Sequence, residues 1–362
     1  MVSPGGAERT LFELHQIWPD APIYTAAYTP EKFPEFANAD VRVTWLNRIK
    51  LAKTKHQLFP LLRAWAFRSL NLSEYDIIIS SSSAEAKYVR KGKHTLHICY
   101  CHTPIRYYWS DYDWYLAHPP FGRLNLVAQS ILPFIIHGLR RMDYKAAQRV
   151  DLFIANSMHV QKRIATYYKR QSTVIYPPVS VERFSLSTER GDYYLIVGRQ
   201  VAYKRLDLAV DAFNELGLPL KVSGVGEEIA KQKPRAKSNI EFLGRVGDEQ
   251  LADLYAGAKG FIFPAEEDFG IVPVEAMASG TPVIAYGEGG VLETVIDGKT
   301  GIFFHEKSAL ALVEAIKRFE KMKFDPSFIR KHALTFGDTV YRRKMESYVD
   351  EHWLEYTKSR KR

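Results

Sequence analysis

Two carboxylates stand around a predicted helix start in "AEEDFGIVPVEAMASGTPVIA", residues 265–285. Glu267 lies in the turn after the apolar strand "GFIFPA", and Glu275 follows eight positions later. Gly270 begins the predicted helix, and Pro273 is acceptable there because first-turn amides lack partners within a helix anyway. The free N–H groups and the positive dipole end of this helix form a ready site for an anion.

The spacing of the two glutamates suits a diphosphate that carries hydroxyl-bearing rings on both sides. If the diphosphate lies at the helix start, Glu275 is about 7–8 Å further along the axis at the standard helical rise. Carboxylates accept hydrogen bonds from hydroxyls, so one glutamate would bind the hexose and the other the ribose of a nucleotide sugar. The alternative is that Glu267 caps the helix and Glu275 is a solvated surface residue.

Two basic residues follow another predicted strand, "YYLIVG", which ends at Gly198. Arg199 comes directly after it, and Lys204 lies five residues further on. Cations are unfavourable at a helix N-terminus unless an anion is present, which argues against ordinary surface positions. In a parallel sheet this strand would end at the same edge as Glu267. The pair would then neutralise the charge of a departing diphosphate.

These side chains are positioned by a regular alternation of strands and helices from Asp192 onward. Short apolar runs such as "LKVSGVG", "IEFLGRV" and "PVIAY" alternate with amphipathic segments such as "KRLDLAVDAFNEL" and "SALALVEAIKRFEK". Buried strands that alternate with helices predict a parallel sheet covered on both faces. Ligands of such sheets bind at the carboxyl ends of the strands.

The N-terminal half alternates less regularly, with predicted strands "YDIIISSSS", "HTLHICYC" and "VDLFIANS". The glycine-rich turn "SPGGAE" enters a helix, yet only Met1 and Val2 precede it, so we expect the first strand to be missing from this sequence. A misassigned start codon is the simpler explanation for that. We expect domains at 1–178 and 179–337, with a linker near 176–181. A C-terminal helix at about 338–362 is expected to pack back on the first domain.

Composition bounds the class of protein. The chain has 362 residues, with 46% hydrophobic and 25% charged residues, which is typical of a globular protein of two domains. The net charge of +9 favours anionic partners, although it could serve solubility alone. Cys99 and Cys101 are the only cysteines, so no second cysteine pair is present to complete a zinc site. A disulfide framework is implausible with two cysteines at this spacing, and we therefore expect a reducing cytoplasm. The longest apolar run is too short to span a bilayer.

Four stretches together resemble a known family. "EEDFGIVPVEAMASGTPVIA", "VGRQVAYKR", "GEGGVLETVIDGKTGIFF" and "YCHTPIRYYW" are similar to the retaining family-4 glycosyltransferases, or glycosyl transferase group 1. The last stretch looks most like mannosyltransferases of bacterial polysaccharide assembly. The resemblance implies the α/β fold called GT-B, in which two Rossmann-like domains have parallel sheets that face each other across a cleft.

The resemblance also implies roles. Glu267 would contact the hydroxyls of the donor sugar, and His102 would approach that sugar from the N-terminal domain. Arg199 and Lys204 would hold the diphosphate, and Glu275 the ribose. The implied backbone contributions come from glycine-rich and turn residues: Gly5 and Gly6 near the transferring phosphate or the acceptor, Gly198, Phe269, Gly270 and Ile271 at the phosphate and sugar, and Gly244, Arg245 and Val246 near the base. Without the resemblance, His102 is more simply a structural histidine among tyrosines.

The implied activity is hexosyl transfer from a nucleotide sugar, with GDP-mannose favoured, to a glycan or lipid-linked acceptor in cell-surface polysaccharide synthesis. Neither a cofactor nor a metal is expected. An anionic membrane surface is an expected partner, with a cytoplasmic location that includes the inner face of the plasma membrane. A nucleotide-sugar epimerase or phosphorylase on the same fold and a non-catalytic partner protein stay open as alternatives. Nucleic acid is not expected as a partner, because no recognisable binding module is present.

Three other patterns in the sequence could suggest a function. Asp111 and Asp113 form "DYD", the spacing of metal-dependent sugar transferases of a different fold, but no apolar strand leads into it. Gly224 and Gly226 in "SGVGEEI" lack the third glycine of a dinucleotide site. Basic and aromatic residues interleave in residues 47–70, which indicates either a surface that rests on anionic lipid or a buried helix edged with cations.

Overall fold

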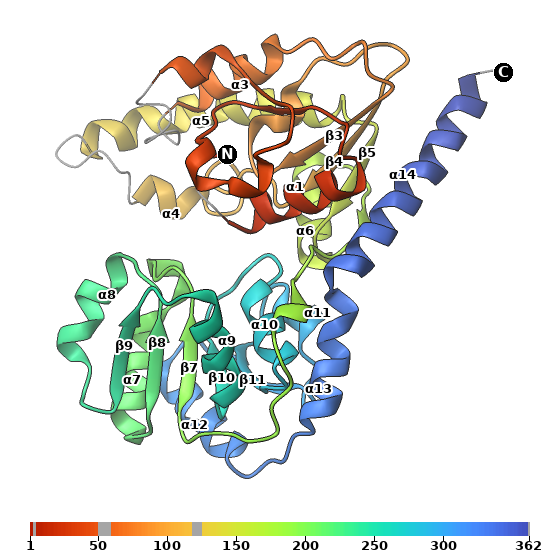
Figure 1. The fold of residues 1–362 in the computed structure, drawn as a ribbon. Coiled ribbons are helices and arrows are strands. Elements are labelled where there is room, and N and C mark those ends of the chain that lie inside the picture. The colour runs from red at the N-terminus through yellow and green to blue at the C-terminus, as the bar shows by residue number, and fades with distance from the viewer. Residues whose placement is uncertain (3–4, 50–58, 118–124, 361–362) are drawn as a thin grey trace. The chain divides into compact units, whose positions relative to one another are not determined.

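The computed structural model describes residues 1–2, 5–49, 59–117 and 125–360, and every structural statement below concerns these ranges. The chain forms two compact units (Figure 1). The first unit comprises residues 1–176 and 342–362, and the second comprises residues 177–341.

A parallel sheet of six strands forms the centre of the second unit, in the order β12-β11-β10-β7-β8-β9. The strands are short and apolar. Every residue of β10 and β11 is buried, because helices cover the sheet on both faces. Their bounds are Tyr194–Val197 (β7), Leu220–Ser223 (β8), Ile240–Gly244 (β9), Gly260–Phe263 (β10), Val283–Tyr286 (β11) and Gly301–Phe304 (β12).

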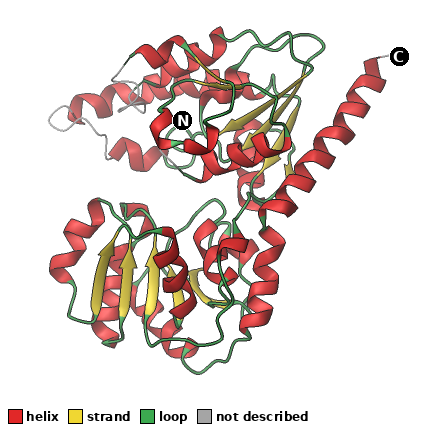
Figure 2. Cartoon of the chain, viewed as in Figure 1, coloured by secondary structure: helices red, strands yellow, loops and turns green. Residues whose placement is uncertain are grey.

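Helices follow the strands of this sheet in alternation, as Figure 2 shows by colour. Helices α7 and α12 pack together, and buried Phe213 and Ile316 join the core cluster between helix and sheet. The apolar faces that the helical periodicity predicts for these two segments are therefore the faces that pack in the core. The helices are α7 (Leu206–Leu216), α8 (Glu227–Gln232), α9 (Asp248–Gly257), α10 (Ile271–Ala278), α11 (Val291–Thr294), α12 (Ala309–Phe319) and α13 (Pro326–Ala333).

The first unit contains a parallel sheet of four strands in the order β3-β4-β5-β6. These strands are Ile77–Ser82 (β3), Leu96–Cys101 (β4), Leu152–Ala155 (β5) and Thr173–Val174 (β6). A separate parallel pair, β1 (Ile23–Thr25) and β2 (Val41–Val43), was not expected from the sequence. Strands of three residues carry too little alternation to be recognised by pattern.

Helices cover the first unit's sheets, and short 3₁₀ segments connect many of the elements. The helices are α1 (Gly6–Ile17), α3 (Pro60–Ser69), α4 (Tyr112–Ala117), α5 (Asn125–Ala147), α6 (Met158–Arg163) and α14 (Asp338–Arg360). The described 3₁₀ helices of the first unit are Pro30–Lys32, Pro34–Phe36, Trp45–Arg48 and Glu85–Tyr88, and Ile164–Tyr168 forms a π-helical turn. Those of the second unit are Val181–Arg183, Ala202–Lys204, Lys233–Arg235 and Leu334–Phe336.

The two ends of the chain meet within the first unit. Residue Arg342 of α14 forms an ion pair of 2.5 Å with Glu13 of α1, and the Tyr356 hydroxyl donates to the carbonyl of Thr95 at 3.0 Å. In the described part of the chain no strand precedes α1, and the Met1 ammonium group donates to the carbonyl of Ala27 at 2.9 Å.

The predicted α/β class with parallel sheets in separate domains is confirmed. No described helix is both long enough and apolar enough to pass through a bilayer.

Candidate functional site

The segments that carry most of the predicted site residues leave the carboxyl ends of neighbouring strands in the second unit. Strand β7 is followed by Gly198 and Arg199, and β10 is followed by the segment from Pro264 to Gly270. The two strands pair directly in parallel, with Gly260 opposite Tyr194. The two segments therefore start side by side at one edge of the sheet.

Lys204 and Glu267 contact each other at this edge. The Lys204 ammonium group forms an ion pair with the Glu267 carboxylate, and their side chains are only 16% and 17% exposed. Lys204 also lies 5.7 Å from the ring centres of Tyr203 and Phe263. The structure therefore brings together one residue predicted to bind phosphate and one predicted to bind sugar hydroxyls, in a partly shielded position where charge interactions are stronger than in water.

A glycine pair in the loop after β11 holds the Glu267 backbone. Gly289 forms an isolated parallel bridge with Glu267, and the N–H of Gly290 donates to the Glu267 carbonyl at 2.8 Å. A Cβ atom on Gly290 would lie 2.4 Å from the Asp268 carbonyl oxygen, so a larger residue would displace this segment. The sequence signals these two glycines only by their place in "GEGG", which does not identify Glu267 as their partner.

The start of α10 has the backbone geometry of an open anion site. Gly270 is the N-cap residue, in the left-handed region at φ +88°, and no side chain caps the helix. The interpretation of Glu267 as a helix cap is therefore wrong. The next residue, Ile271, begins the helix, and its first-turn amides have no partner within the helix. Phe269 is buried against Phe336, which fixes the turn.

Glu275 lies within α10 and is partly buried. Its Oε2 accepts a hydrogen bond of 3.1 Å from the hydroxyl of Tyr255, a buried residue of α9. Burial and the nearby carboxylate raise the pKa of Tyr255 well above its usual value, so this hydroxyl stays a donor. The interpretation of Glu275 as a solvated surface residue is therefore wrong.

The ends of β7, β8 and β9 approach so closely that glycine is required. Gly198 has φ +133°, and a Cβ on Gly224 would lie 1.9 Å from the Gly198 carbonyl oxygen. The N–H of Gly224 donates to the Gly244 carbonyl at 2.7 Å. These contacts explain Gly224 by packing, without a dinucleotide.

The remaining candidate residues of this unit do not take part in the contact between Lys204 and Glu267. Arg199 is exposed and forms no ion pair with any described residue. Gly244 ends the edge strand β9, and Arg245 and Val246 follow it; β8 separates this strand from β7.

Three candidates belong to the first unit. His102 directly follows β4; its Nε2 lies 2.8 Å from the Ser81 hydroxyl, and its ring meets Tyr100 edge to face at 5.2 Å. Gly5 is the extended N-cap residue of α1, Gly6 is the first residue of that helix, and both are exposed.

The other patterns also have a place in the structure. Asp111 lies 4.0 Å from Arg106, and within the described ranges no group of three or more histidine, cysteine or acidic residues is arranged to hold a metal. Cys99 and Cys101 are buried free thiols. In the basic segment 47–70, residues 50–58 lie outside the described residues.

Two family models match the chain. Residues 4–183 match the model described as Glycosyltransferase Family 4, and residues 179–335 match that described as Glycosyl transferases group 1. Together the two matches cover the chain from residue 4 to residue 335.

Individual relatives and solved structures are similar to this chain. An uncharacterized glycosyltransferase from Methanocaldococcus jannaschii is 32% identical over 178 residues, which are 47% of this chain and 50% of that protein. The alpha-1,3/1,6-mannosyltransferase ALG2 of Dictyostelium discoideum is 27% identical over 39% of this chain and 45% of its own length. HepE from Anabaena, solved with UDP and glucose, has a TM-score of 0.70 at 20% identity, covering 97% of both chains. The chain spans about half the length of the relatives it matches, and the solved structures show that its fold is GT-B.

Proposed function

The chain belongs to the group 1 glycosyl transferases, and on that premise we propose that it transfers a hexose from a nucleoside-diphosphate sugar to a hydroxyl of a glycan or lipid-linked acceptor. The observation that carries this proposal is the contact between Lys204 and Glu267 beside the start of α10. One edge of the sheet thereby offers a cation and free amides for a diphosphate, and a carboxylate for sugar hydroxyls.

In the proposed reaction the bond between the anomeric carbon and the diphosphate breaks first, through an oxocarbenium-like state. Negative charge grows on the departing phosphate, and Lys204, Arg199 and the first amides of α10 stabilise it. The acceptor hydroxyl then attacks from the face that the diphosphate leaves, and a phosphate oxygen takes the acceptor's proton. The anomeric configuration is therefore retained.

Donor binding requires the ion pair to open or to share its charges. When a donor diphosphate approaches, Lys204 gains phosphate oxygens as partners, and Glu267 can accept hydrogen bonds from the sugar. We propose that Glu275, whose position in α10 is supported by the hydrogen bond from Tyr255, accepts a hydrogen bond from the ribose. His102, Gly5 and Gly6 are assigned to sugar and acceptor binding by the first unit.

We propose GDP-mannose as the first donor to test and UDP-glucose as the second. The stretch "YCHTPIRYYW" and the named mannosyltransferase relative support mannose, whereas the HepE structure holds UDP and glucose. No metal or cofactor takes part in the proposed reaction. The proposed setting is polysaccharide synthesis at the inner face of the plasma membrane, where a lipid-linked acceptor would lie.

The test begins with thermal shifts of the purified chain in GDP, UDP, GDP-mannose and UDP-glucose. The expected result is a rise in Tm with one nucleotide and with its sugar, because a ligand that binds only the folded state stabilises it. Incubation with that donor and lipid extract should then yield a glycosylated lipid of retained anomeric configuration. Conversion of the donor without any acceptor would instead indicate an epimerase, and no response to any nucleotide would contradict the proposal.

A further inference from the structure

Helix α5 is fixed to the first unit by one buried carboxylate. Asp143 is fully buried and receives hydrogen bonds from Lys87 at 2.7 Å, from the Trp109 indole at 2.8 Å and from the Tyr168 hydroxyl at 2.7 Å. A buried charge with this many donors holds its helix in one rotation about its axis. Ile136 and Leu139 lie on the same inward side and are buried.

The opposite side of α5 exposes large apolar side chains. Phe134 is 81% exposed, Ile131 is 50% exposed and Ile135 is 44% exposed. Their spacing places them next to each other along the outer side of the helix. Exposed apolar residues are ordinary when single, but three within five positions of one helix form a continuous apolar surface.

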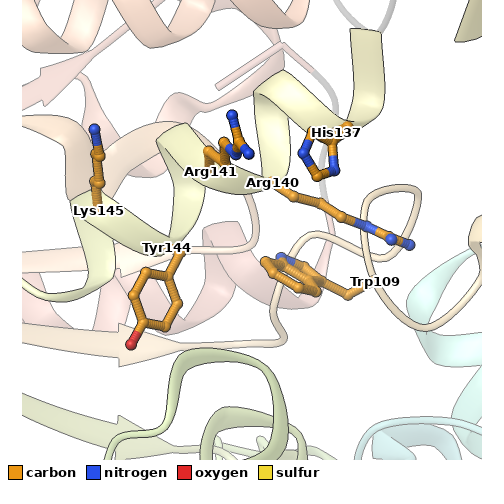
Figure 3. Close-up of a pocket in the computed structure, with 6 residues that line it drawn as sticks. All are labelled: Trp109, His137, Arg140, Arg141, Tyr144 and Lys145. Atoms are coloured by element: carbon orange, nitrogen blue, oxygen red, sulfur yellow. The ribbon is translucent and has the colours of Figure 1, made fainter. Parts of the chain in front are cut away.

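The same side of the helix becomes basic toward its C-terminus. Arg141 and Lys145 stand seven and eleven positions after Phe134, which places them on the same face. Figure 3 shows that both extend from one side of α5, while Tyr144 extends from the other. We call Ile131, Phe134, Ile135, Arg141 and Lys145 the outer face of α5.

Helix α3 also exposes apolar side chains and carries basic residues. Ala64 of α3 and Ala146 of α5 belong to one core cluster with Tyr88, and α3 exposes Trp65 and Leu61. Beyond α5, burial and the positive charge of Arg68 on α3 lower the pKa of Arg149, so cations from two elements lie close together.

Neither α5 nor α3 exposes an acidic side chain. Helix α3 has no acidic residue, and the only one in α5 is Asp143, which is buried. The basic end of this face borders a cavity of about 600 Å³, which is lined by Trp109, His137, Arg140, Arg141, Tyr144 and Lys145 (Figure 3). Apolar, aromatic and basic groups are thus arranged along one helix in the order that suits the boundary between lipid tails and phosphate head groups.

We propose that the outer face of α5 binds the surface of a bilayer that contains anionic phospholipids. Phe134 and the two isoleucines enter the acyl boundary, and Arg141 and Lys145 bind lipid phosphates about 10–16 Å further along the helix at the standard rise. The inference deepens the proposed function and rests on it for one point, namely that the acceptor is lipid-linked. It assigns the membrane contact to α5.

Charge complementarity favours a bilayer over the other possible occupants. In a symmetric pair of this chain, the outer faces would meet either cation against cation or cation against apolar surface. Nucleic acid would satisfy the cations but would leave Phe134 and Ile131 in water. An anionic bilayer satisfies both halves of the face at once.

Flotation of the full chain with vesicles tests the proposal. We expect binding to phosphatidylcholine vesicles that contain phosphatidylglycerol, little binding to phosphatidylcholine alone, and weakening by salt. The double variant Arg141→Glu/Lys145→Glu should bind about thirtyfold more weakly or worse, since each basic residue near an anionic surface contributes on the order of 1 kcal/mol. Phe134→Ser should lose about tenfold, because the inserted ring is removed.

Matched control variants lie in the second unit. Leu310→Ser changes an apolar side chain that is 64% exposed, and Lys321→Glu/Lys323→Glu reverses two exposed cations. Both controls should bind vesicles like the parent chain. Circular dichroism and the nucleotide-induced rise in Tm show whether each variant is folded, independently of vesicle binding.

The outcomes separate this inference from the proposed function. A parent chain that responds to nucleotides but does not float with anionic vesicles overturns the inference alone. Equal binding by the parent and both α5 variants also overturns it. So does a dimer in sedimentation that Phe134→Ser dissociates, or binding to random oligonucleotide in place of vesicles. A chain that floats but responds to no nucleotide would leave the membrane face standing and contradict the transferase.

Discussion

The ammonium group of Lys204 contacts the carboxylate of Glu267, 63 residues further along the chain. Lys204 ends a 3₁₀ turn after β7, and Glu267 lies in the turn after β10, so the pairing of these two strands creates the contact. In this arrangement the two charges stabilise each other until a donor replaces their contact with phosphate and hydroxyl partners.

Replacement of Lys204 by alanine should reduce turnover about 100- to 1,000-fold, since it removes a charge that stabilises the leaving phosphate. The free energy of unfolding should fall by only about 1–3 kcal/mol, the cost of leaving the mostly buried Glu267 carboxylate without this partner. Steady-state kinetics and urea denaturation measure the two effects. Lys321→Ala is the control, and unchanged turnover in Lys204→Ala would refute the assigned role.

Replacement of Gly290 by alanine should lower kcat/KM about 100-fold. Its Cβ would clash with the backbone at Asp268 and Phe269 and shift the turn that carries Glu267, and small misplacements of catalytic groups are costly. Gly247→Ala is the matched control, since Gly247 has an ordinary φ and its added Cβ meets no atom within 4 Å. Similar kinetics for the two variants would argue against this support of Glu267.

Acid should destabilise the first unit through His97. This residue is buried beside the Ser80 hydroxyl at 2.9 Å, and desolvation lowers its pKa from 6.5 to about 3. Below pH 6.5 the unfolded chain binds a proton that the folded chain does not, so stability is lost as the pH falls from 6.5 toward 3. His97 contributes no such loss above that range.

The measurement is urea denaturation at pH 7 and pH 5.5, for the parent and for His97→Asn. The parent should lose about 1 kcal/mol more than the variant between these two values. Because all other titrating groups are common to both chains, an equal loss in the two would show that His97 does not titrate in this way.

Chelation of divalent metal should leave turnover unchanged if the diphosphate is neutralised by Lys204, Arg199 and α10. Activity would be measured with excess EDTA and after adding back Mg²⁺ or Mn²⁺. Activity that disappears with EDTA and returns with metal would contradict the proposal and direct attention to Asp111 and Asp113. The variant Asp113→Asn then serves as the check, since this residue is exposed on α4.

Much of the fold was predictable because its signals are local. Strands such as "GFIFPA" are apolar at successive positions, which is typical of a parallel sheet with helices on both faces. The helical segments that alternate with these strands from Asp192 onward supply the connections that such a sheet requires. The strands β1 and β2 were not predictable, since three residues show no usable periodicity.

The sequence alone determined which residues can bind a diphosphate and hydroxyl-bearing rings. The glutamates, the cations and the glycine that starts the helix are recognisable from their residue types and their spacing along the chain. Only the tertiary structure decided that Lys204 meets Glu267, that Tyr255 engages Glu275 and that Gly290 supports the turn. The membrane face of α5 also depended on it, because the burial of Asp143 sets which side of the helix is exposed. The physical reason is that strand pairing and helix packing join residues far apart in the chain, and no local pattern records those partners.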